Sequence, residues 1–155
     1  HAFTLPMALC WPDMKWPVRT IPVCVNTVQG PLPSAARCYR LGQAIGRAIA
    51  SWPGDERVVV MGTGGLSHQL DGERAGFINK EFDLAFMDSM VTNPAWATKY
   101  STTELVELSG TQGVELLNWV VARGALPEKV KQQHANYHIP ISNTASGLMV
   151  LEPLS

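Results

Sequence analysis

The sequence lacks a long hydrophobic run, a cysteine framework and an excess of charge of one sign. Its apolar runs are far shorter than the roughly 20 residues that cross a membrane, and no basic-then-apolar leader is present. The 12 basic and 13 acidic residues nearly cancel, so the totals give no sign of nucleic acid or an anionic membrane surface as a partner. These absences lead us to expect a cytoplasmic protein.

Cysteine is scarce and irregularly spaced. Cys10, Cys24 and Cys38 form no C-x-x-C pair, and an odd number fits neither a disulfide framework nor a zinc knuckle. We expect three reduced and mostly buried thiols. Cys38 falls within an amphipathic helical pattern, which favours a core role over catalysis.

Length and hydrophobic content favour one domain over residues 1–155. The chain has 155 residues, 46% of them hydrophobic, which is enough for one real core and too little for two comfortable ones. It starts at His1 without a methionine, and the opening stretch HAFTLPMAL is already rich in core-type residues. We therefore expect an interior start, with an earlier part of the protein missing.

The hydrophobic pattern predicts an α/β fold, with a mixed central sheet flanked by helices. Residues 18–28 are rich in β-branched side chains, and residues 58–61 form a short apolar run before glycines, so both predict strands. Between them, Ser34 is a candidate N-cap of a helix that Pro53 and Gly54 end.

The second half of the chain predicts further helices and a final strand. Phe82, Phe86, Met87 and Met90 share one face of a predicted helix. The other expected elements are a short helix at 105–108 after the capping-box pattern STTE, a helix within 111–126, and a strand in the apolar run that follows the polar loop near residue 140.

His68 follows the second predicted strand, in the turn GTGGLSHQL. Ligands in open α/β sheets gather at the carboxyl ends of strands, so His68 is either a working acid–base group or a polar residue capped by a neighbouring carbonyl. Ser67 directly precedes it, and adjacent side chains diverge, which excludes a Ser–His dyad in regular geometry. The turn matches neither glycine-rich phosphate motif, so a nucleotide-binding module is a weak alternative.

Glu115 lies within the apolar stretch VELLNWVV. It either faces inward, where the carboxylate needs a cation, a metal or a strong donor, or it is exposed in the first turn of a helix and stabilised by the helix dipole. His134 and His138 are four residues apart without the glutamate of H-E-x-x-H. We expect these two histidines to face solvent.

Three stretches carry a resemblance to a known family: GTGGLSHQLDGERAGFINKEFD, GTQGVELLNWVVARGAL and NYHIPISNTASG. They resemble the catalytic β-subunit family of the class III extradiol dioxygenases, which includes protocatechuate 4,5-dioxygenase and gallate dioxygenase. The likeness extends over essentially the whole chain. It implies an enzyme that uses O2 to open the ring of a carboxylated catechol or gallate. The resemblance also implies an Fe(II) ion that two histidines and one carboxylate bind. It also implies a dimer or an αβ assembly.

The resemblance implies roles for four residues. His68 matches the family's acid–base histidine, and Glu115 matches its iron-binding carboxylate. His1 matches a histidine that lines the substrate pocket, and Ser142 resembles a contact to the substrate carboxylate.

The family's two iron-binding histidines belong to motifs that this chain does not contain. The chain therefore resembles the C-terminal part of a catalytic domain. We expect it to be inactive alone and to need the missing N-terminal part, or another chain, to complete the iron site. The alternative is a catalytically silent binding or structural subunit that keeps the fold without the metal histidines.

Overall fold

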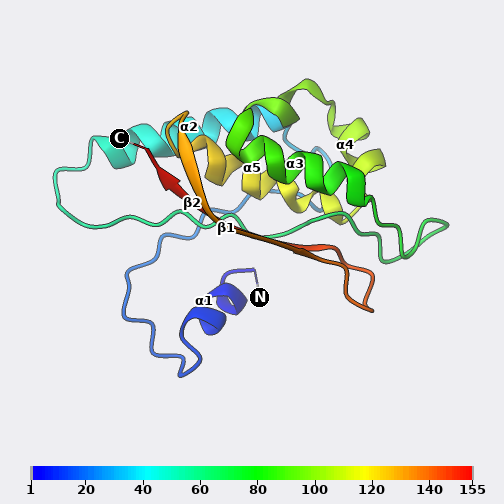
Figure 1. The fold of residues 1–155 in the computed structure, drawn as a ribbon, viewed down its shortest axis with the longest axis horizontal. Coiled ribbons are helices and arrows are strands. Elements are labelled where there is room, and N and C mark those ends of the chain that lie inside the picture. The colour runs from blue at the N-terminus through cyan, green and yellow to red at the C-terminus, as the bar shows by residue number, and fades with distance from the viewer. Residues whose placement is uncertain (1, 155) are drawn as a thin grey trace.

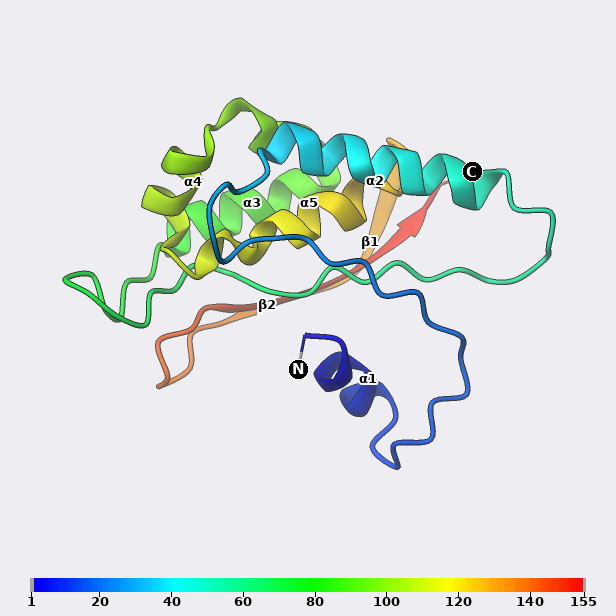
Figure 2. The same ribbon diagram turned by 180° about the vertical axis from the view of Figure 1, so that it is seen from behind.

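The computed structural model describes residues 2–154 and shows helices packed against a two-stranded sheet (Figure 1). The elements in chain order are α1 (Thr4–Cys10), α2 (Ala35–Ala50), α3 (Lys80–Thr92), η1 (Trp96–Lys99), α4 (Thr102–Ser109), η2 (Gly113–Leu116), α5 (Leu117–Gly124), β1 (Val130–His138) and β2 (Ser146–Pro153). Helices α2, α3 and α5 lie together on one side of the β1–β2 hairpin, whereas α1 lies apart from them in both views (Figure 2). The predicted α/β class is confirmed.

Two helices begin at the caps that the sequence predicted. The Ser34 hydroxyl accepts a hydrogen bond from the Arg37 backbone N–H at the start of α2, and Ser101 and Glu104 form a capping box at the start of α4. These side chains satisfy backbone donors that a helix start leaves unpaired. None of the helices between residues 2 and 154 is long and apolar enough to span a membrane.

The core lies between the helices and the inner face of the hairpin. The four residues predicted on one face of α3 are all buried: Phe82, Phe86, Met87 and Met90. On β2, Met149 and Leu151 pack against this core, while Leu148 and Val150 point away and are 56% and 47% exposed. The strand expected near the end of the chain is confirmed, and its outer face is apolar and open to solvent.

Strand β1 was not predicted from the sequence. It pairs antiparallel with β2 from Val130 opposite Pro153 to His138 opposite Ser146, with an irregularity between Gln132 and His134. Most of its residues are polar and exposed. The strand therefore exists because β2 pairs with it, and its own sequence carries no alternating apolar pattern.

The two strands predicted at 18–28 and 58–61 are wrong as sheet members. Both segments lack regular secondary structure, and the sheet of the described residues contains only β1 and β2. A strand needs a hydrogen-bonded neighbour, and no other strand lies along either segment within residues 2–154. Consequently Val58 and Val59, expected to be buried, are 49% and 73% exposed.

The predicted free thiols are confirmed for all three cysteines, and the predicted burial is confirmed for one and wrong for two. All three are free thiols; Cys38 on α2 is buried, but Cys10 and Cys24 are exposed. Burial raises the pKa of the Cys38 thiol to about 11. Cys38 is therefore a protonated core residue at neutral pH, as expected for a structural cysteine.

Helices α2 and α5 approach each other closely through glycine. A Cβ at Gly42 would overlap the carbonyl oxygen of Val121 and lie 2.8 Å from the Cα of Gly124. A Cβ at Gly46 would lie 2.6 Å from the carbonyl oxygen of Ala125. These obstacles are backbone atoms, which cannot move aside like the end of a flexible side chain.

Gly42→Ala should lower the free energy of unfolding by about 1–3 kcal/mol, the usual cost of overpacking. The direction is diagnostic, because alanine in place of an exposed helical glycine stabilises a helix by about 1 kcal/mol. Urea denaturation followed by circular dichroism measures the change. The exposed Ala44→Ser control should stay within about 0.5 kcal/mol of wild type. A stabilised Gly42→Ala variant would contradict the close contact between the helices.

Candidate functional site

The turn that ends in His68 lies directly against η2, which carries Glu115. The backbone N–H of Gly113 donates to the carbonyl oxygen of His68 over 3.2 Å, and the N–H of Gly65 donates to Glu115 Oε2 over 3.2 Å. The sequence predicted both residues separately, 47 positions apart by their numbers. The fold thus places the two main site candidates on adjoining segments.

Glu115 is half-buried and points toward the glycine turn. Gly64 has a φ of +116°, and a Cβ there would lie 2.8 Å from Glu115 Cβ and 3.2 Å from its Oε2. The carboxylate therefore packs on bare backbone. The sequence left open whether Glu115 faces inward or is exposed on a helix. The structure favours the inward orientation, because Glu115 is only partly exposed and accepts from a backbone N–H.

His68 is buried, with 7% of its surface exposed, and its ring is held by its own turn. The Nδ1 atom lies 2.8 Å from the carbonyl oxygen of Leu66. A carbonyl only accepts hydrogen bonds, so this contact assigns a proton to Nδ1 and leaves Nε2 as the nitrogen that can gain or lose one. His68 is thus capped by a neighbouring carbonyl, as the second alternative from the sequence expected. The same contact also produces the tautomer that an acid–base group would use.

A buried carboxylate that the sequence analysis missed, Asp83 on α3, holds the residue before His68. Asp83 Oδ1 accepts from the Ser67 N–H over 2.9 Å, and Oδ2 accepts from the Ser67 hydroxyl over 2.6 Å and from the Tyr137 hydroxyl over 2.8 Å. The Ser67 hydroxyl is therefore directed to Asp83, which confirms that Ser67 and His68 form no dyad.

Burial and hydrogen bonding act in opposite directions on this carboxyl group. The pKa of Asp83 is raised overall, because burial outweighs the hydrogen bonds from Ser67 and Tyr137 and the charge that His68 carries when protonated, all of which lower it. The pKa of Tyr137 is raised by burial and by the neighbouring carboxylate.

The sequence did contain a signal for Asp83. It lies three, four and seven positions before Phe86, Met87 and Met90, so it falls on the buried face of the same helix. An aspartate in such an apolar stripe must find donors when it is buried. The partners Ser67 and Tyr137 are distant in sequence and could not be identified from it.

The loop that carries Ser142 is joined to the same turn. The N–H of Leu66 donates to the carbonyl oxygen of Ala145 over 2.8 Å, and the N–H of Ala145 donates to that of Ser67 over 3.2 Å. Ser142 itself is exposed on this loop. Its predicted contact with a substrate carboxylate stays a prediction.

The remaining histidines divide into two cases. His134 and His138 are exposed on β1, as predicted. His1 lies outside the described residues, so its predicted place in a substrate pocket stays a prediction. The following residue, Ala2, is described, and its carbonyl oxygen accepts from the Thr63 hydroxyl over 3.4 Å.

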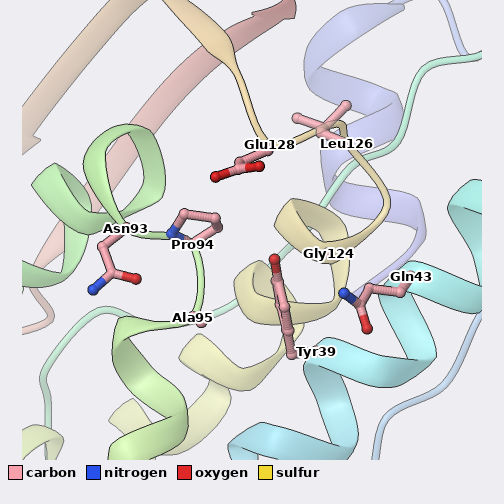
Figure 3. A pocket seen from close by; sticks show the side chains of 8 residues that line it. All are labelled: Tyr39, Gln43, Asn93, Pro94, Ala95, Gly124, Leu126 and Glu128. Carbon is pink, nitrogen blue, oxygen red and sulfur yellow. The ribbon is translucent and has the colours of Figure 1, made fainter.

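A hollow of about 320 Å³ lies elsewhere, where α2, the end of α3 and the end of α5 meet (Figure 3). Tyr39 and Gln43 reach it from α2, and Glu128 from the segment after α5 (Figure 3). Neither His68, Glu115 nor Ser142 lines it. The candidate site is therefore separate from this hollow.

The donors needed for a three-ligand metal site are not gathered in the described part of the chain. Among residues 2–154, no group of three His, Cys, Asp or Glu side chains could hold a metal ion. Glu115 supplies one hard, anionic oxygen donor of the kind that iron accepts. The residues present fit an iron site only as a contributor of one ligand.

Comparison with known proteins identifies relatives along nearly the whole chain. The family described as the catalytic LigB subunit of aromatic ring-opening dioxygenase matches residues 1–147. Gallate dioxygenase of Pseudomonas putida is 42% identical over 153 residues, covering 98% of this chain and 45% of that protein.

Two further relatives carry the name 2,3-dihydroxyphenylpropionate/2,3-dihydroxicinnamic acid 1,2-dioxygenase. The protein from Photorhabdus laumondii is 42% identical over 84 residues, covering 54% of this chain and 25% of its own length. The protein from Xanthobacter autotrophicus is 30% identical over 183 residues, covering 88% of this chain and 57% of its own length. The chain thus spans about half the length, or less, of these curated relatives.

Gly64→Ala should destabilise the chain more than Gly72→Ala. Both glycines have a positive φ, +116° and +73°, so each alanine carries backbone strain of about 1–3 kcal/mol. Only at position 64 does the added Cβ also crowd Glu115; at position 72 the nearest atom is Gln69 Nε2 at 3.7 Å. Chemical denaturation of the two variants measures the difference. Equal losses would show that Glu115 is not packed tightly on the turn.

Proposed function

We propose that this chain, which belongs to the family of the catalytic LigB subunit of aromatic ring-opening dioxygenases, is part of an enzyme that performs extradiol ring cleavage with O2. The observation that carries the proposal is that the turn ending in His68 is hydrogen-bonded to the segment that carries Glu115. His68 is a buried imidazole whose Nδ1 lies on the Leu66 carbonyl, and Glu115 is a half-buried carboxylate, so the two adjoining segments bring together an acid–base side chain and an anionic donor.

The substrate we propose is a carboxylated catechol or gallate, such as protocatechuate or gallate. The relatives are named for gallate and for 2,3-dihydroxyphenylpropionate, which share adjacent ring hydroxyls and a carboxylate. Ser142 lies on an exposed loop tied to the His68 turn, a suitable place for a hydroxyl donor to the substrate carboxylate. His1 is the proposed second residue of the substrate pocket.

His68 would act as the acid–base residue. A catechol must lose a proton before it can bind a metal as an anion, and an imidazole can accept that proton and later return it. With Nδ1 held on the Leu66 carbonyl, Nε2 is the atom that would take it. The buried ring is held by its own backbone, so its orientation does not depend on the substrate.

Fe(II) is the proposed cofactor, with Glu115 as its carboxylate ligand. Bound iron would supply open coordination positions for the substrate and O2. Because the described residues contribute one ligand, the two histidines would come from the N-terminal part of the protein or from another chain. An assembly as a dimer or an αβ complex is consistent with the exposed apolar residues Val59, Leu148 and Val150.

A catalytically silent binding or structural subunit is the second candidate. It is favoured by one observation, that no three-ligand group exists among residues 2–154. The two candidates differ in whether the purified full-length protein consumes O2 after anaerobic loading with Fe(II). No uptake with either protocatechuate or gallate, at proven iron content, would support the silent subunit.

His68→Phe should reduce the rate of O2 uptake by at least about 100-fold, because general acid–base catalysis typically contributes 10²–10⁴-fold. Phenylalanine keeps the planar ring and its burial but removes both nitrogens. The exposed His138→Phe variant is the matched control and should retain the wild-type rate. Initial rates with gallate and protocatechuate, at equal iron content, provide the measurement. A His68→Phe variant with full rate would refute the assigned role.

Glu115→Gln should weaken Fe(II) binding by at least about tenfold, the lower end of the loss caused by removing even an outer partner of a metal site. Glutamine keeps the size and the acceptor for Gly65 but removes the negative charge. Metal content after anaerobic dialysis is measured beside that of Glu73→Gln, an exposed loop residue whose change should have no effect. Equal iron retention in both variants would exclude Glu115 as a ligand.

A further inference from the structure

We propose that Asp83 is a positioning residue for His68, which acts through the peptide unit between Leu66 and Ser67. The inference rests on the proposed acid–base role of His68 and adds a residue to that site. Asp83 lies on α3, outside the turn, and does not reach the reacting atoms itself. Its effect passes through one shared peptide group.

The geometry of that peptide group carries the argument. Its N–H, from Ser67, donates to Asp83 Oδ1 over 2.9 Å. Its C=O, from Leu66, lies 2.8 Å from His68 Nδ1. In a trans peptide these two groups point in opposite directions, so the carboxylate and the imidazole lie at the two ends of one polarisable unit.

The hydrogen bonds around Asp83 are those of a carboxylate. The backbone N–H of Ser67 is an obligatory donor. The Ser67 hydroxyl accepts from the backbone N–H of Asn79 over 2.8 Å, so its proton is left to donate to Asp83. The Tyr137 hydroxyl supplies a third donor. Three donors and no acceptor among these contacts favour the ionised form.

A carboxylate at one end of the peptide strengthens the hydrogen bond at the other. Accepting from the N–H polarises the amide and makes its carbonyl oxygen a better acceptor, as in hydrogen-bonded chains. The stronger acceptor favours the Nδ1–H tautomer of His68 and leaves Nε2 basic and available. Asp83 would thus do indirectly what a carboxylate does when it contacts a histidine directly.

Packing alone is a poor explanation for an aspartate at this position. Asp83 is 0% exposed, among Phe82, Phe86 and Met87 on the buried side of α3. A buried charge is expensive to desolvate, and well-packed apolar residues often serve stability equally well or better. A role for the charge in the adjoining site accounts for it.

The test uses the full-length protein labelled with ¹⁵N-histidine and purified without added iron, so that NMR signals stay sharp. Wild-type His68, assigned by its absence in His68→Phe, should be protonated at Nδ1. Asp83→Asn, which keeps the shape and removes the charge, should shift the tautomer toward Nε2–H and lower kcat for O2 uptake about tenfold with little change in KM. Tyr137→Phe and Ser67→Ala keep the carboxylate and the peptide N–H, so both should retain the wild-type tautomer.

Each outcome decides the proposal. A wild-type His68 protonated at Nε2, an unchanged tautomer in folded Asp83→Asn, or an equal shift in Tyr137→Phe would overturn it. If Asp83→Asn does not fold, the wild-type protein decides: a Ser67 amide proton shifted downfield together with an Nδ1-protonated His68 supports the relay, and the lack of either overturns it. The NMR readout needs no turnover, so it is separate from a failure of the proposed ring cleavage.

Discussion

The buried carboxylate of Asp83 is the interaction on which the arrangement of the candidate site depends. It accepts hydrogen bonds from Ser67 on the glycine turn and from Tyr137 on β1, and it belongs to α3. A charge buried without donors would cost several kcal/mol, so the turn, the hairpin and the helix are held where those donors meet it. The position of His68 follows, because it is the next residue along the chain from Ser67.

Backbone hydrogen bonds also hold His68 in place. His68 donates its N–H to the carbonyl oxygen of Ser109 and accepts at its own carbonyl from Gly113, which ties it to the end of α4 and to η2. Glu115 comes two residues after Gly113 and is thereby placed beside the turn. The sequence indicated His68 and Glu115 as separate candidates, and for each it left open a purely structural role. Their proximity results from the tertiary structure, so neither local sequence pattern could predict it.

Local sequence patterns predicted the helix starts that nearby residues stabilise. The Ser34 cap and the capping box from Ser101 to Glu104 fix helix starts within four residues, so the sequence was sufficient for them. The strand at 58–61 depended on a neighbour that a local pattern cannot supply, and there the prediction was wrong. Strand β1 shows the reverse case, since its polar sequence gave no sign of pairing that β2 nonetheless provides. Asp83 was missed because its donors come from distant parts of the chain.

The wrongly predicted strand and the incomplete ligand set of the proposed iron site have one explanation in common. The segment at 58–61 is an apolar run with Val59 largely exposed, and the hairpin leaves Leu148 and Val150 open on its outer face. Apolar surface of this kind is unfavourable in water and is usually covered in the working protein. In the proposed iron site, Glu115 would be one ligand of several, while the chain spans about half the length of relatives such as the gallate dioxygenase. Packing and coordination chemistry, which are independent, both favour the proposal that additional polypeptide covers this surface and completes the site.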